Sequence, residues 1–104
     1  MSLATTPSKD PYLDQVRDIV LTALAGEAAS VILFGSRVWG RPRRGSDVDV
    51  GILAERALAQ ETLARVRAAL EESIVPYSVD VVDLSTVDEQ FRRKVLEDGV
   101  RWTA

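Results

Sequence analysis

The sequence predicts an α+β domain in which helices flank a mixed β-sheet. Short apolar runs of strand length, longer stretches with helical apolar spacing, and turn or cap residues between them lead to this prediction. The elements follow in the order helix, strand, turn, strand, helix, strand, helix. With 104 residues, 46% of them apolar, the chain is long enough for one small core. We therefore expect a disordered tail over residues 1–10 and a single domain over residues 11–104.

The first two elements are marked by their boundary residues. A helix is expected over Pro11–Ala25, because Asp10 is a suitable N-cap and Pro11 occupies the favoured first helical position. Gly26 is suited to end this helix. The run Ala29–Phe34 is almost continuously apolar, which is typical of a buried strand.

A loop over residues 35–46 separates this strand from a second one, which we expect over residues 47–53. The following stretch, residues 57–73, carries apolar side chains at helical spacing and predicts the second helix. The stripe on one face of this helix consists of Leu63, Val66 and Leu70.

The third strand is expected over residues 78–84 and the third helix over residues 86–98. Ser85 or Thr86 is the expected N-cap of that helix, and Gly99 its stop. The core residues expected from this helix are Phe91 and Leu96. A short final strand can follow, in which Trp102 packs at the edge.

The connections predict how these strands are arranged. A loop between the first two strands favours antiparallel pairing, whereas a helix between the second and third favours a parallel crossover. The end of the first strand and the starts of the other two then meet at one edge of the sheet. Five residues converge there: Gly35, Ser36, Asp47, Asp49 and Asp80.

Asp47 and Asp49 form the central pair of candidate ligands. Side chains alternate along a strand, so both carboxylates point to the same face, where they repel unless a cation lies between them. The chain has no cysteine and no histidine, so the cation must be a hard one, with Mg²⁺ or Mn²⁺ the natural candidates. Asp47 alone would be read as a turn or cap residue.

Asp80, on the neighbouring strand, is the expected third ligand. Three carboxylates can hold two metal ions, one acidifying an attacking hydroxyl and the other neutralising a leaving pyrophosphate. Asp83 competes with Asp80 for this role, but alternation places it on the opposite face, and a turn or capping role is expected for it.

The Gly35-Ser36 pair, with Arg37, is the candidate phosphate site. Glycine permits close approach to the backbone, and a helix N-terminus after Ser36 would favour anions. An ordinary turn at the end of a strand is the alternative for the Gly-Ser pair. The loop contains three further arginines, Arg41, Arg43 and Arg44. They could bind a triphosphate or an acidic protein partner, and the alternative is a solvated basic loop.

Composition excludes other classes of function. The formal charge is −3, so no global basic field argues for direct nucleic-acid binding. No apolar run approaches the roughly 20 residues of a membrane span. No signal peptide is visible, so a cytoplasmic location is expected.

The motif Gly35-Ser36, ten residues, Asp47-Val48-Asp49, followed by Asp80 in an apolar strand, resembles that of the minimal nucleotidyltransferases. These belong to the DNA polymerase β-like nucleotidyltransferase superfamily, and the likeness covers about residues 11–102. The resemblance implies the nucleotidyltransferase fold, with core strand order 1-2-3. It also implies a phosphate site at the Gly-Ser pair and three metal ligands, which map onto Asp47, Asp49 and Asp80.

The same resemblance implies a biological role. Many such short proteins are antitoxins whose partner is a helical HEPN-domain ribonuclease, and they can transfer AMP from ATP to a tyrosine of that toxin. Two alternatives stay open. The chain could neutralise a partner by binding alone, or it could transfer a nucleotide to a small molecule such as an antibiotic.

Overall fold

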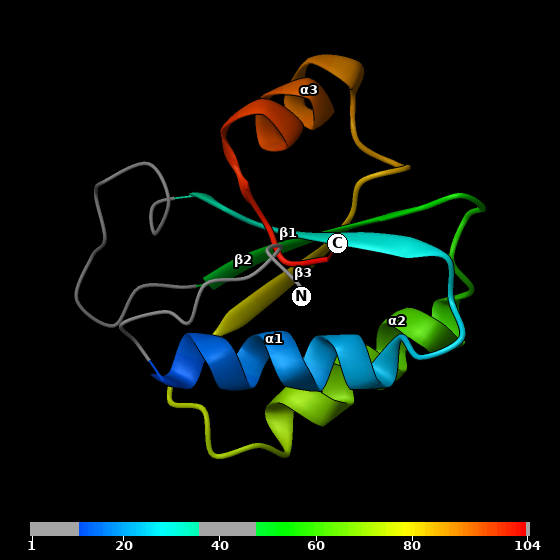
Figure 1. Ribbon diagram of the computed structural model, residues 1–104. Helices are drawn as coiled ribbons and strands as arrows, with labels where there is room; N and C mark the ends of the chain where they lie inside the picture. Colours follow the sequence, from blue (N-terminus) through cyan, green and yellow to red (C-terminus); the bar gives the residue numbers. More distant parts are fainter. Residues whose placement is uncertain (1–10, 36–47, 104) are drawn as a thin grey trace, which may run out of the picture.

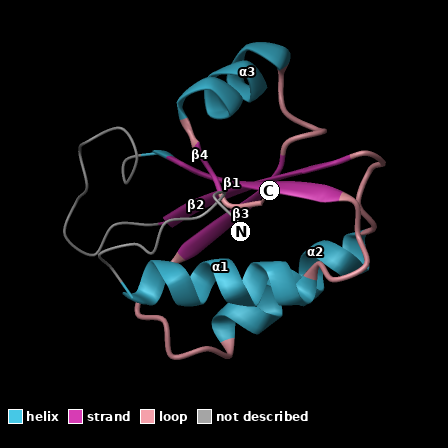
Figure 2. Cartoon of the chain, viewed as in Figure 1, coloured by secondary structure: helices cyan, strands magenta, loops and turns pink. Residues whose placement is uncertain are grey.

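The computed structural model describes residues 11–35 and 48–103. A four-stranded mixed sheet lies at the centre of these residues, with α1 and α2 on one face and α3 on the other (Figure 1 and Figure 2). The elements are α1 (Pro11–Ala23), β1 (Ala29–Phe34), β2 (Val48–Ala54), α2 (Gln60–Glu71), β3 (Val79–Asp83), α3 (Glu89–Asp98) and β4 (Val100–Arg101). The predicted α+β class and the order of elements are confirmed. The tail expected over residues 1–10 lies outside the described residues.

The sheet has the strand order β3-β2-β1-β4. β1 pairs with β2 in the antiparallel sense, as expected for two strands joined by a loop. β2 pairs with β3 in the parallel sense, because α2 provides the crossover between them. The predicted core order 1-2-3 is confirmed, and β4 adds an antiparallel strand beside β1.

The larger core lies between the sheet and the pair α1 and α2. Val16 and Val20, one helical turn apart on α1, are fully buried in one cluster with alternate residues of β2 such as Val50 and Ile52. On α2, Val66 and Leu70 face this core as expected. Their buried neighbour on α2 is Thr62, whereas the expected Leu63 is only partly buried.

A smaller core lies on the opposite face, under α3. It contains Ile32, Phe34, Leu84 and Val95. Phe91, one turn before Val95, packs against it, and its ring meets that of Phe34 edge-on with centroids 5.7 Å apart.

The prediction that Leu96 belongs to the core is wrong, since this residue is 47% exposed. Phe91 and Val95 are four residues apart on α3, so both side chains point toward the sheet. Leu96 lies one position further along, about 100° around a helix of 3.6 residues per turn.

The N-cap expected for α3 is also wrong. The helix begins at Glu89, with the Asp88 side chain accepting a hydrogen bond from the Phe91 backbone N–H at 2.9 Å. Ser85 and Thr86 are instead held in the turn after β3, where both donate hydrogen bonds to Asp83. The hydroxyls of Ser85 and Thr86, which we expected to cap the helix, are therefore bonded within the turn.

Candidate active site

The parallel register of β2 and β3 places two acids side by side. Asp49 is the direct partner of Asp80, and partners in a parallel ladder project from the same face of the sheet. That face is the one on the α3 side, because Asp49 is also the partner of Phe34, which packs in the smaller core. Asp49 is half-buried and Asp80 is exposed, so the pair lies at the border between the core and solvent.

Gly35 lies directly against the Asp49 carboxylate. This glycine follows β1, is buried and has a φ of +86°. A Cβ atom at Gly35 would collide with Asp49 Oδ2 and would lie 3.0 Å from Asp49 Cγ. The Asp49 carboxylate therefore fits only because residue 35 has no side chain. The end of β1 lies beside the start of β2, as expected.

The two acids fit a hard divalent cation. Neighbouring strands lie about 4.8 Å apart, so two carboxylates on paired residues repel unless a positive charge lies between them. Oxygen ligands from acidic side chains are those that Mg²⁺ and Mn²⁺ prefer. Within residues 11–35 and 48–103, no group of three potential ligands surrounds one point. The expected further ligand, Asp47, lies outside the described residues.

Asp83 has the local role expected for it. Its side-chain Oδ1 accepts hydrogen bonds from the Ser85 backbone N–H at 3.0 Å and from the Ser85 hydroxyl at 2.7 Å. Its ladder partner is Ile52, a residue of the larger core, so Asp83 belongs to the face opposite the acid pair. This carboxylate closes a turn and does not join Asp49 and Asp80.

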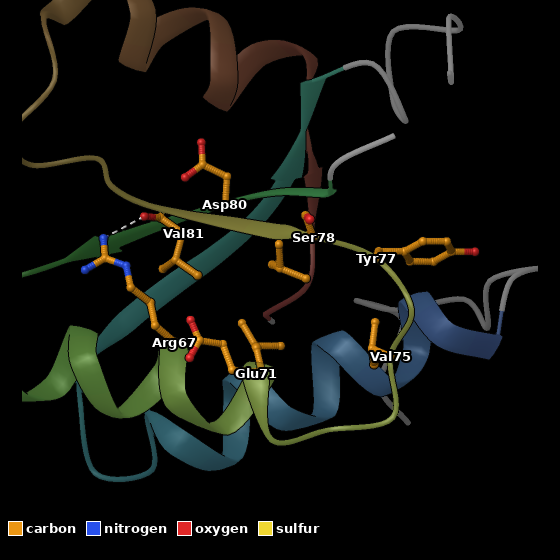
Figure 3. Close-up of a pocket in the computed structure, with 9 residues that line it drawn as sticks. Arg67, Glu71, Val75, Tyr77, Ser78, Asp80 and Val81 are labelled. Carbon is orange, nitrogen blue, oxygen red and sulfur yellow. Dashed lines mark hydrogen bonds between the residues drawn. The ribbon is translucent and has the colours of Figure 1, made fainter. Parts of the chain in front are cut away.

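Sequence reasoning missed a groove beside β3. A cavity of about 490 Å³ lies between this strand and α2, and Asp80 is among its lining residues. Arg67 and Glu71, four residues apart on α2, form part of its wall (Figure 3). The four-residue spacing of this pair is visible in the sequence, but the sequence does not show which side of α2 overhangs β3.

Two other candidate residues, Ser36 and Arg37, lie outside the described residues, as do the further loop arginines. Their assignment to a phosphate site stays a prediction from the sequence. In the part of the chain that the structure describes, no helix is both long and apolar enough to cross a bilayer.

Comparison with known proteins gives a consistent result. The profile of the family described as polymerase beta, nucleotidyltransferase, matches residues 21–101, a range that includes Gly35, Asp49 and Asp80. A Haemophilus influenzae protein named as a probable protein adenylyltransferase, MntA, is 40% identical over 63 residues. That match covers 61% of this chain and 55% of the relative, so the chain spans just over half of the relative's length.

Solved structures share the fold. A candidate minimal nucleotidyltransferase superposes with a TM-score of 0.69 at 29% identity, covering 90% of this chain and 98% of that one. A complex of a tri-AMPylated HEPN toxin with its MNT antitoxin, from Shewanella oneidensis, matches with a TM-score of 0.59 at 19% identity. That match covers 90% of this chain and 71% of the other, and at this identity it shows the fold alone.

Proposed function

The chain belongs to the polymerase β-type nucleotidyltransferase family, and on that basis we propose that it transfers AMP from ATP to a tyrosine of a HEPN-type partner toxin. AMP attachment would silence the toxin, which makes the chain an antitoxin. The similarity to a protein named as an adenylyltransferase supports the proposed transfer. The AMPylated HEPN toxin seen with an MNT antitoxin of the same fold supports the proposed acceptor.

The observation that carries the proposal is the pairing of Asp49 with Asp80 beside Gly35. A purely structural sheet would gain nothing from two acids on paired residues, because like charges on neighbouring strands are destabilising. Placed where the ends of three strands meet, they form a negatively charged pair suited to a divalent cation and a triphosphate.

The reaction is an in-line displacement at the α-phosphorus of ATP. The tyrosine oxygen forms a bond to the α-phosphorus, and the bond from that phosphorus to the bridging oxygen of the β-phosphate breaks. Pyrophosphate leaves with the electron pair of the broken bond. We assign the acceptance of the hydroxyl proton to Asp80, and its greater exposure than Asp49 supports this assignment.

Asp49 and Asp80, joined by Asp47 as expected from the sequence, would hold two divalent cations. Mg²⁺ or Mn²⁺ bound there would acidify the attacking hydroxyl and neutralise charge on the leaving pyrophosphate. The chain itself fixes the two carboxylates: Gly35 leaves room for Asp49, and the β2–β3 register sets the position of Asp80 relative to it.

The test is to co-express the chain with the product of its neighbouring gene and to analyse both proteins by mass spectrometry after incubation with ATP and Mg²⁺. The proposal predicts one or more AMP groups on a tyrosine of the partner, and none with the Asp49→Asn variant. A tight complex that stays unmodified would favour neutralisation by binding alone. AMP on a small-molecule acceptor, with neither protein modified, would favour the antibiotic-type activity.

A further inference from the structure

β3 forms one edge of the sheet, and its outer side is not paired with another strand within residues 11–35 and 48–103. The hydrogen bonds to β2 show which backbone groups point outward. Val48 N–H donates to the Ser78 carbonyl at 2.8 Å, and Leu84 N–H donates to the Ile52 carbonyl at 2.9 Å. The backbone N–H and C=O groups of residues 78, 80, 82 and 84 therefore point toward β2. Those of Val79 and Val81 point outward, away from the sheet.

The groove described above runs along this outer side. Arg67 Nη2 donates to the outward-pointing Val81 carbonyl at 3.0 Å, so a strand that pairs along this edge has to take this acceptor over from Arg67 (Figure 3). Glu71 and Val75 add to the wall of the groove below the strand, whereas the Asp80 side chain projects to the opposite side of the strand (Figure 3). The edge thus separates a charged groove from the acid pair.

We propose that the acceptor segment of the partner protein binds as an extended strand along the outer edge of β3, with its modified residue opposite Asp80. This inference rests on the function proposed above and adds to it how the acceptor is held. Addition of a strand to an open sheet edge supplies affinity through main-chain hydrogen bonds, and alternate side chains supply specificity.

The pairing rules of a sheet explain why this edge suits an acceptor. Residues opposite each other on paired strands project from the same face, with Cβ atoms about 5 Å apart. A tyrosine opposite Asp80 would therefore share the face of Asp49 and Asp80, and its hydroxyl would approach the acid pair from the outer side. The described residues offer a second open edge at β4, but β1 and β2 separate that edge from Asp80.

The neighbours of the modified residue would project to the other face, into the groove. There they would meet the guanidinium of Arg67 and the carboxylate of Glu71. We expect an acidic residue on one side of the acceptor and a basic residue on the other, each complementary to one wall charge.

The test uses a proline at each edge of the sheet. Val79→Pro removes an outward N–H at the first residue of β3, a position where an edge strand tolerates proline. The matched control is Arg101→Pro in β4. Trp102 N–H donates to the Val31 carbonyl of β1. Because backbone groups alternate along a strand, the N–H of Arg101 points outward from the β4 edge. Far-ultraviolet circular dichroism checks that both variants keep the fold.

The probe is the acceptor protein that mass spectrometry identifies in the co-expression experiment. We expect Val79→Pro to raise the KM for this acceptor at least tenfold, with ATP affinity unchanged, and Arg101→Pro to leave both values unchanged. Hydrogen exchange of the Val79 and Val81 amides of the unmodified chain should slow at least tenfold when the acceptor binds.

Two results would overturn the inference. In one, the acceptor is modified efficiently while both amides exchange at the same rate as in the free chain. In the other, the amides are already protected without acceptor in a particle with the mass of two chains, so that a second copy occupies the edge. If no acceptor is modified by the unaltered chain, the proposed function itself fails, which separates the two conclusions.

Discussion

Replacement of Gly35 by alanine tests the link between the backbone at the end of β1 and the acid pair. The structure offers a matched control, because Gly26 has nearly the same backbone conformation, with φ of +92° against +86°. A Cβ at Gly26 would have no heavy atom within 4 Å, whereas one at Gly35 would collide with the Asp49 carboxylate. The two substitutions therefore share the backbone strain and differ in the collision.

The expected magnitudes follow from this difference. A Cβ in the left-handed region costs about 1–2 kcal/mol, and both variants should lose this much stability. Forcing Asp49 aside adds about 1–3 kcal/mol to the cost of Gly35→Ala, as for other overpacked sites. For a domain of this size, each kcal/mol corresponds to about 4–8 °C in Tm. Displacing a reacting group by about 1 Å costs on the order of 100-fold in rate, and only Gly35→Ala should show this loss.

Urea denaturation of both variants gives the stability difference, and AMP transfer to the partner gives the rate. Gly26→Ala should transfer AMP at the rate of the unaltered chain. The reasoning would be refuted if Gly35→Ala were no less stable than Gly26→Ala and transferred AMP equally fast. In that case the Asp49 carboxylate moves aside at no cost, and its position does not matter to the reaction.

Other predictions concern the acids, a helix cap and the cation. Asp80→Asn should lower AMP transfer at least about 100-fold in steady-state assays, since a positioned proton acceptor typically contributes about 10²–10⁴-fold. Asp83→Asn should keep near-normal transfer, because an amide oxygen can still accept the Ser85 hydrogen bonds; equal losses in both variants would contradict the assignment. Asp88→Ala should lower the free energy of unfolding by about 1 kcal/mol in urea denaturation, as expected for a lost N-cap bond to Phe91; an unchanged midpoint would contradict that role. Removal of divalent cations with EDTA should stop transfer and excess Mg²⁺ or Mn²⁺ should restore it, whereas undiminished transfer in EDTA would exclude the cation.

The convergence of the strand ends was predictable from the sequence, because it depends only on the lengths of the connections. A loop before β2 and a helix after it fix the directions of three strands, and these directions bring Gly35, Asp49 and Asp80 to one edge. The exact register was not predictable. Only the structure shows that Asp49 pairs with Asp80 itself rather than with a neighbouring residue.

Local polar contacts were harder to predict. The sequence between β3 and α3 offers several capping residues, and Asp88 forms the cap because Ser85 and Thr86 are already bonded to Asp83. Such competition depends on the geometry of the turn, which residue type alone does not reveal. The prediction for Leu96 failed for a different reason: Phe91 and Val95, four residues apart, share the face toward the sheet, and Leu96 lies about 100° further around the helix.

The role of Gly35 shows what three-dimensional information adds. A glycine before a serine at a strand end suggested close approach of a phosphate to the backbone. The structure adds a second reason, which is contact with Asp49 from the adjacent strand. That contact follows from the pairing of Phe34 with Asp49, a long-range feature that a local motif does not contain.

The most direct test of the proposed site is a crystal structure of the chain with Mn²⁺ and a non-hydrolysable ATP analogue. Anomalous scattering from manganese locates the cation without ambiguity. We expect a manganese peak that is coordinated by carboxylate oxygens of both Asp49 and Asp80 and by the triphosphate. A bound nucleotide with manganese elsewhere, and with these two carboxylates coordinating nothing, would contradict the proposed site.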